Sequence, residues 1–146
     1  MDATYYLQRE HFDRGEKVLA AAGAIEVRAF RFTTGVEALR VSTAVGEVLL
    51  LPFQGQQIWD ARFFGRRITM ESMFREPVPG VPFLRTYGGF LLHCGFTAMG
   101  GPTGDDTHDL HGELPNAAYQ EASIRFGEDD RGAYFALTGR YRHTEA

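Results

Sequence analysis

The sequence is poor in cysteine and contains no long hydrophobic run. Cys94 is the one cysteine among 146 residues, so no disulfide can form within the chain, which fits a reducing compartment. No stretch approaches the roughly 18 apolar residues that a membrane-spanning helix requires. The charged N-terminus also lacks the apolar core of a signal peptide. We therefore expect a cytoplasmic protein with no membrane partner.

Clustered basic charge is absent as well. The 15 basic residues are outnumbered by 19 acidic ones, and the formal net charge is −4. All the basic residues except Lys17 are arginines, and they are scattered along the chain. Binding to phosphate backbones requires a basic patch or stripe, so we expect no nucleic-acid partner.

The sequence pattern is mainly that of β-strands. Residues 25–32 alternate apolar and charged side chains with a period of two, which is typical of a half-buried strand. In residues 47–53, the positions after Glu47 are apolar one after another, which favours a central strand covered on both faces. Glycines separate these segments and suit tight turns between antiparallel strands. The pattern predicts one domain over residues 1–146, mainly β, built as an antiparallel β-sandwich.

Other segments give weaker signals. Residues 1–23 show a poor helical pattern, interrupted by Gly15, and we interpret them as an N-terminal appendage. Residues 66–70 suit a short strand, and residues 75–83 hold three prolines that favour a loop or covering flap. Near the C-terminus, two alternating segments flank the sequence GEDDRG, whose acidic and glycine residues suit a hairpin turn.

Residues 87–116 concentrate the side chains that carry chemistry. This segment holds three of the five histidines, the cysteine and many glycines. An apolar run of strand type, Gly89 to His93, leads into a Gly/Pro/Thr/Asp loop. The loop ends in a second polar cluster that contains His108, Asp109, His111 and Glu113. Loops of this composition usually present their side chains to solvent, so we place the candidate site here.

The side chains of this segment are compatible with two kinds of chemistry. Two imidazoles and a carboxylate within six residues could hold a metal ion, as in a cupin-like barrel that uses His93, His108, His111 and Glu113. The same groups could instead bind sugar hydroxyls and move protons near neutral pH.

Trp59, the sole tryptophan, could offer a flat face to a sugar ring, although such an aromatic more often packs in a β core. His11 and His143, near the termini, look like ordinary surface residues.

Two long phrases of the sequence resemble a known family. Residues 86–119 read TYGGFLLHCGFTAMGGPTGDDTHDLHGELPNAAY, and residues 50–74 read LLPFQGQQIWDARFFGRRITMESMF. Together they resemble the first half of proteins of the galactose mutarotase-like, or aldose 1-epimerase, superfamily, especially its poorly characterised bacterial branch. The likeness spans residues 37–141. Its most specific part is Leu110-His111-Gly112, preceded by Gly89, Cys94 and Gly95.

The resemblance implies a β-supersandwich that binds sugars in an open cleft without a metal or cofactor. In mutarotases, a base takes the proton of the anomeric hydroxyl and an acid protonates the ring oxygen, so that the ring opens and recloses as the other anomer. His111 matches the family histidine that contacts the sugar, which makes it the best catalytic candidate. His93 lies near the family's substrate-contacting arginine, whose motif is absent here. Further substrate contacts are expected from Glu113, Asp106 and Trp59.

Family members are about twice as long and carry their main catalytic histidine and glutamate in the second half. The resemblance therefore predicts the N-terminal half of a larger supersandwich, which would pair with a C-terminal half or form a homodimer. The leading hypothesis is a sugar-binding, aldose 1-epimerase-like protein. The alternatives are a non-catalytic carbohydrate-binding or regulatory module and the metal-dependent, cupin-like sugar isomerase.

Overall fold

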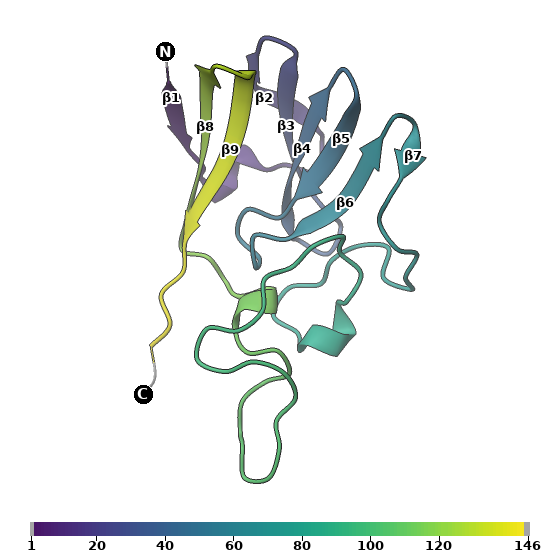
Figure 1. The fold of residues 1–146 in the computed structure, drawn as a ribbon, viewed down its shortest axis with the longest axis vertical. Coiled ribbons are helices and arrows are strands. Elements are labelled where there is room, and N and C mark those ends of the chain that lie inside the picture. The colour runs from purple at the N-terminus through teal and green to yellow at the C-terminus, as the bar shows by residue number, and fades with distance from the viewer. Residues whose placement is uncertain (1, 145–146) are drawn as a thin grey trace.

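A computed structural model describes residues 2–144, and its strands form two antiparallel sheets (Figure 1). The larger sheet has six strands in the order β2-β3-β4-β5-β6-β7. The smaller has three in the order β1-β8-β9. The strands are β1 (Ala3–Tyr6), β2 (Lys17–Ala22), β3 (Ile25–Arg31), β4 (Glu37–Thr43), β5 (Gly46–Leu50), β6 (Ile58–Phe63), β7 (Arg66–Arg67), β8 (Glu121–Asp129) and β9 (Gly132–Arg140). Three short 3-10 helices are η1 (Arg9–His11), η2 (Phe83–Arg85) and η3 (Leu114–Asn116).

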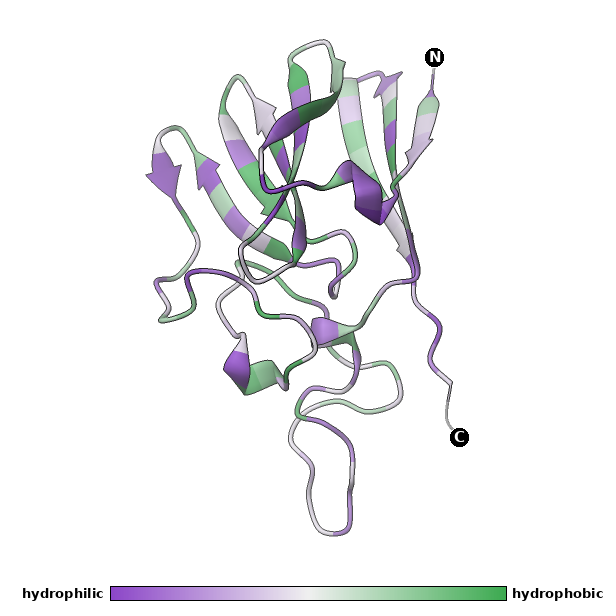
Figure 2. Cartoon of the chain, turned by 180° about the vertical axis from the view of Figure 1, so that it is seen from behind, coloured by the Kyte–Doolittle hydropathy of each residue, from purple (hydrophilic) through white to green (hydrophobic). Residues whose placement is uncertain are grey.

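The larger sheet follows the hydrophobic pattern of the sequence. In β3, Val27 and Ala29 are buried while their neighbours are partly exposed, as the period of two predicts. The central position predicted for residues 47–53 is confirmed for β5, which pairs with β4 on one side and β6 on the other. Leu50 packs in one core cluster and Leu49 against the other, so both faces of this strand are covered. Figure 2 shows the alternating hydrophobic and hydrophilic bands along these strands.

The predicted β-sandwich is confirmed, because the main core lies between the two sheets. Leu39 and Leu50 of the larger sheet belong to the same buried cluster as Ala122 and Ile124 of β8. Each large aliphatic side chain buried in this way contributes about 1.5–3 kcal/mol to folding. A second cluster covers the opposite face of the larger sheet, and it consists of Val36, Ala38, Leu51 and Trp59.

The C-terminal hairpin also forms as the sequence predicts. β8 and β9 pair along their whole length, from Glu121 opposite Arg140 to Asp129 opposite Gly132. At the turn, the carboxylate of Asp129 accepts hydrogen bonds from the backbone and side chain of Arg131. Gly132 follows with a φ of 111°, a conformation that suits glycine.

The prediction of an N-terminal appendage is wrong. β1 pairs with β8, and β2 pairs with β3, so the first residues complete both sheets. Between these strands, Leu7 and Phe12 are buried in the main core, and the backbone of Leu7 donates to the carbonyl of Ala122. The helical pattern is poor because a strand, a 3-10 turn and a second strand share this short stretch.

Residues 68–120, called the loop layer below, lie across one end of the sandwich (Figure 1). The proline-rich part is irregular, as predicted, and is tied to the β3–β4 turn by Thr34, whose hydroxyl donates to the carbonyl of Pro77 at 2.6 Å. The strand expected at Gly89 to His93 is reduced to a bridge between Leu91 and Ile58 of β6. None of the helices in the described part of the chain has the length and apolar character needed to cross a bilayer.

Candidate functional site

The Leu110-His111-Gly112 motif closes the base of a long loop. Gly95 and Gly112 form a parallel bridge, and the backbone of Gly95 donates to the carbonyl of His111 at 2.7 Å. His111 in turn donates its backbone N–H to the carbonyl of Gly100 at 2.8 Å. Gly112 has a φ of 75°, and a Cβ there would collide with the carbonyl oxygen of Ala98. The loop base can therefore close only around a glycine at this position.

His111 itself has a left-handed backbone, with a φ of 65°. For a residue other than glycine, such a conformation costs about 1–3 kcal/mol and persists only where its surroundings hold it. Here the two backbone hydrogen bonds on either side of the residue hold it. The imidazole packs edge-on against Phe83 of η2, with 4.9 Å between ring centroids.

Glu113 lies just after this motif and is held by Thr97. Its carboxylate accepts hydrogen bonds from the backbone N–H of Thr97, at 3.1 Å, and from the Thr97 hydroxyl. These bonds stabilise the ionised form, and they lower the pKa of Glu113. The nearest nitrogen of His143, Nε2, is 3.8 Å from Oε1 of Glu113.

Residues that follow β9 complete this cluster. The hydroxyl of Tyr141 lies 3.1 Å from Nδ1 of His143. The Tyr141 ring contacts Phe96 on one side and Tyr119 on another, with centroid separations of 5.7 and 5.8 Å. Burial, followed by the negative charge of Glu113, raises the pKa of the Tyr141 hydroxyl. Tyr141 therefore stays a neutral phenol at physiological pH.

These elements surround a cavity of about 410 Å³. We call it the Glu113–Tyr141 cavity. A second hollow, of about 270 Å³, lies against strands β8 and β9 and is lined by residues such as Ser123 and Thr138. The Glu113–Tyr141 cavity is lined by Gly80, Val81, Pro82, Phe83, Asp109, Leu110, Gly112, Glu113, Pro115, Asn116, Ala117, Ala118 and Tyr141.

The structure brings two of the predicted contact residues to this region. Glu113 lines the cavity directly. His111 does not line it but contacts Phe83, which does. His93 lies on the segment that precedes Gly95 and is not part of the wall.

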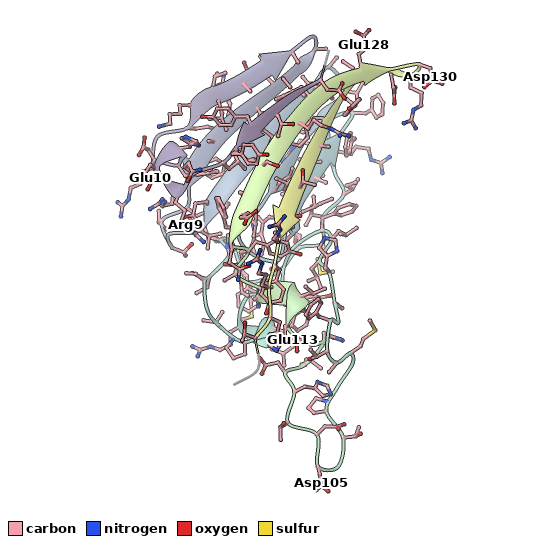
Figure 3. All side chains as sticks on the ribbon, turned by 90° about the vertical axis from the view of Figure 1, so that its left-hand side faces the viewer. Arg9, Glu10, Asp105, Glu113, Glu128 and Asp130 are labelled. Carbon is pink, nitrogen blue, oxygen red and sulfur yellow. The ribbon has the colours of Figure 1, made fainter. Side chains whose placement is uncertain are left out.

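The prediction that Asp106 contacts the same ligand is not supported by its position. Asp106 is exposed in the long loop, where it accepts hydrogen bonds from the backbone and hydroxyl of Thr103. These bonds lower its pKa, with the backbone N–H of Thr103 as the largest cause. Figure 3 shows the adjacent Asp105 at the far tip of this loop, well away from Glu113. The Asp106 carboxylate caps a turn because Asp readily bonds to backbone two or three residues away.

The prediction that Trp59 offers a stacking face to a sugar is wrong. Trp59 lies on β6, and its side chain is 5% exposed and belongs to the second core cluster. Gly88 and Gly89 of the loop layer lie against its ring. The core interpretation, which is usual for aromatics in β-proteins, therefore holds.

The metal-binding alternative finds no ligand set. Across residues 2–144, no group of three or more His, Cys, Asp or Glu side chains is arranged to hold a metal ion. His108, one of the proposed ligands, lies in the long loop with its Nδ1 2.8 Å from the carbonyl oxygen of Asp109. The short spacing of the proposed ligands in the sequence therefore does not predict that their side chains meet in the fold.

Sequence reasoning misses the contribution of the C-terminal residues to the site. Position alone marks His143 as an ordinary surface residue, and nothing singles out Tyr141. The signal available is the alternation Tyr141-Arg142-His143, which places the two rings on the same side of an extended chain. The alternation does not predict that this segment approaches Glu113, because the approach depends on the long-range pairing of β8 with β9.

Comparison with known proteins gives a family but no activity. No curated protein and no solved structure matches this chain. A family model does match, over residues 33–146, and its description is a domain of unknown function, DUF4432. The match includes strands β4 to β9 and the whole loop layer. The chain therefore belongs to the DUF4432 family.

Proposed function

We propose that the Glu113–Tyr141 cavity binds a neutral sugar and that the chain acts as the ligand-binding part of an aldose 1-epimerase-like protein. The observation that carries this proposal is the make-up of the cavity wall. It combines the carboxylates of Asp109 and Glu113 and the hydroxyl of Tyr141 with the apolar ring of Phe83. Sugars present hydroxyls and apolar C–H faces together, and a few polar groups on an apolar wall suit them.

The carboxylate of Glu113 has capacity left for a ligand. An ionised carboxylate offers about four lone-pair sites, and the two hydrogen bonds from Thr97 occupy two of them. The lowered pKa keeps the group ionised at neutral pH. A sugar hydroxyl that donates to an ionised carboxylate forms one of the stronger hydrogen bonds available in proteins.

The charge of the wall selects among sugars. Asp109 and Glu113 are acidic, and none of the described residues that line the cavity is lysine or arginine. A phosphorylated or acidic sugar would bring a negative charge close to these carboxylates, which is unfavourable. The substrate class is therefore a neutral aldose.

The sequence resemblance supports the same location. Leu110 and Gly112 of the motif line the cavity, and His111 between them packs against Phe83. The most specific part of the resemblance to the galactose mutarotase-like superfamily thus lies at the cavity, whereas Gly89, Cys94 and Gly95 are not part of its wall. The epimerase reaction would require one group to accept the anomeric proton and another to protonate the ring oxygen.

A second candidate function is a carbohydrate-binding module that does not catalyse the reaction. One observation favours it: the imidazole of His111, the expected acid or base, does not line the cavity. Binding needs only the wall, whereas epimerisation needs a proton-transfer group in contact with the sugar. Exchange of sugar anomers, followed by NMR, separates the two functions.

The binding proposal is tested by an NMR titration of the full chain with D-glucose, D-galactose and D-glucose 6-phosphate. We expect saturable binding of a neutral aldose and no detectable binding of the phosphate. Glu113→Gln should weaken sugar binding by about tenfold, because a charge-assisted hydrogen bond becomes a neutral one. Glu121→Gln is the matched control, since Glu121 lines the separate hollow on β8 and β9.

Two results would contradict the proposal. The first is the absence of saturable binding by either neutral aldose. The second is loss of affinity in Glu121→Gln with none in Glu113→Gln, which would move the site to the other hollow.

A further inference from the structure

Glu113, His143 and Tyr141 form a series of carboxylate, imidazole and hydroxyl. Nε2 of His143 faces the carboxylate of Glu113 at 3.8 Å, and Nδ1 faces the hydroxyl of Tyr141 at 3.1 Å. The carboxylate favours the tautomer of His143 that carries its proton on Nε2. Nδ1 then carries the lone pair that accepts a hydrogen bond from the Tyr141 hydroxyl. This is the order of groups by which proteins activate a hydroxyl through a histidine.

The two ends of this series reach the cavity. Tyr141 and Glu113 both line it, while His143 joins them. The rings of Phe96 and Tyr119 pack against Tyr141 and limit its orientation. Phe96 also contacts His143, with 6.2 Å between ring centroids. Tyr141 is thus held at the wall of the cavity, and its hydroxyl is hydrogen-bonded to a proton acceptor, the imidazole of His143.

We propose that Tyr141, linked through His143 to Glu113, is the group that takes the proton from the anomeric hydroxyl of a sugar bound in this cavity. This inference rests on the proposed function and adds the proton-transfer group that His111 does not supply. Tyr141 is the catalytic residue, because its hydroxyl touches the sugar. His143 acts through it as a positioning residue, and Glu113, besides its bond to the sugar, supports His143.

The proton moves in two linked transfers. The anomeric O1–H proton passes to the Tyr141 oxygen as the Tyr141 proton passes to Nδ1 of His143. The electron pair left on O1 forms the C1=O double bond, the C1–O5 bond breaks, and the ring oxygen takes a proton from a water molecule, which becomes hydroxide. This hydroxide takes the proton back when the ring closes. The ionised Glu113 stabilises the imidazolium that results. Rotation about C1–C2 and the reverse transfers close the ring as the other anomer.

The histidine is needed because Tyr141 is a poor base on its own. Burial and the nearby charge of Glu113 disfavour the phenolate, since both raise the pKa of Tyr141. A transfer that leaves the phenol neutral avoids this cost. The positive charge instead appears on His143, next to a carboxylate that Thr97 keeps ionised.

The test measures sugar binding and anomer exchange separately in the full chain. D-Glucose and D-galactose are titrated by NMR to give affinities, and exchange between anomers is followed by NMR exchange spectroscopy at neutral pH. The variants are Tyr141→Phe and His143→Gln. The matched control is Tyr134→Phe, which removes a tyrosine hydroxyl on β9 that is bonded to Asp2, away from the cavity.

The expected result is a loss of exchange with retention of binding. Tyr141→Phe should lower the exchange rate by at least about a hundredfold, the usual contribution of a general base. Its affinity should fall by less than about tenfold, because Asp109 and Glu113 still line the cavity. His143→Gln should also lower the exchange rate while the affinity is retained, because the variant removes the imidazole that accepts the proton of the Tyr141 hydroxyl. Tyr134→Phe should behave as wild type.

The possible failures are distinguishable. If Tyr141→Phe binds sugar and exchanges anomers at the wild-type rate, the inference is overturned and the binding proposal stands. Wild-type binding with exchange no faster than in buffer also overturns the inference and leaves the binding module as the function. Loss of affinity and rate together would make Tyr141 a binding residue only. If no neutral sugar binds, the proposed function itself fails. Should Tyr141→Phe not fold, the affinity and the exchange rate of His143→Gln decide.

Discussion

At the scale of single residues, Gly112 fixes the shape of the cavity wall. It combines a φ of 75° with a position where a Cβ would collide with the carbonyl of Ala98. We expect Gly112→Ala to destabilise the protein by more than the roughly 1 kcal/mol that left-handed backbone alone costs, because the loop base must also open. Denaturant unfolding measures the difference.

Gly104→Ala is the control for this variant. Gly104 has a φ of 60°, but no atom lies within 4 Å of the position of its missing Cβ. The loss of stability in Gly104→Ala therefore measures the cost of the left-handed backbone alone, without a steric collision such as that between residue 112 and Ala98. Equal destabilisation by the two variants would show that the close approach of Gly112 to Ala98 contributes nothing.

The hydrogen bonds between Thr97 and Glu113 should make the stability of the protein depend on pH. The folded-state pKa of Glu113 lies below its ordinary value, and the hydrogen bond from the Thr97 side chain is the largest cause. Ionisation of Glu113 therefore contributes stability that is present above the unfolded-state pKa and is lost as the pH falls through the folded-state pKa. Thr97→Val should raise the pKa of Glu113 and reduce this loss of stability in acid.

Carbon-13 NMR of the Glu113 carboxyl group measures this pKa, and urea unfolding at neutral and acid pH measures the stability. Thr103→Val is the control, since Thr103 makes the corresponding bond to Asp106 in the long loop. It should raise the pKa of Asp106 and leave that of Glu113 unchanged. A Glu113 pKa that is equally low in Thr97→Val would contradict the assigned cause.

The residues of the candidate site are predictable only in part. The motif Leu110-His111-Gly112 is visible in the sequence, because a histidine between a leucine and a glycine stands out in a polar loop. The burial of Trp59 is the expected default for an aromatic on a strand. The pairing of Glu113 with His143 cannot be predicted, since about thirty residues and a hairpin separate them.

At the scale of elements, the N-terminal segment is part of the sandwich. Phe12 is 2% exposed and packs edge-on against Phe53, with 5.9 Å between ring centroids. We expect Phe12→Ala to cost about 3–5 kcal/mol, the usual effect of deleting a buried aromatic ring. Tyr6→Ala, at a side chain that is 70% exposed, should change stability by less than about 0.5 kcal/mol.

Thermal or chemical unfolding of the two variants measures this contrast. An appendage would give the opposite picture, in which neither substitution changes the stability of the domain. Equal and small effects of Phe12→Ala and Tyr6→Ala would therefore contradict the placement of Phe12 in the main core.

Strands are predicted better than the segments between them. The period of two in β3 and the turn residues between β8 and β9 encode local structure directly. The loop layer has no such period. Its shape comes from distant side-chain contacts, such as Gln57 on the β5–β6 connection, whose amide donates to the carbonyl of Pro115 at 2.6 Å and to Asn116 at 3.0 Å. Bonds of this kind leave no pattern in the sequence.

At the scale of the whole molecule, the sandwich is a support and the loop layer carries the cavity. The sheets bury the core, while η2, η3 and the segment after β9 meet at the end of the sandwich and supply the wall (Figure 1). β1 and β9 are the outer strands of the smaller sheet. Association through such an edge, with a second copy or a C-terminal half, stays a prediction.

The central claim is that a neutral sugar binds in the Glu113–Tyr141 cavity. The NMR titration with D-glucose and D-galactose tests it most directly when the shifted backbone signals are assigned along the chain. We expect saturable shifts at Asp109, Glu113 and Tyr141, with the signals of Ser123 and Thr138 in the other hollow unchanged. Shifts confined to Ser123 and Thr138, or no saturable shift with either sugar, would contradict it.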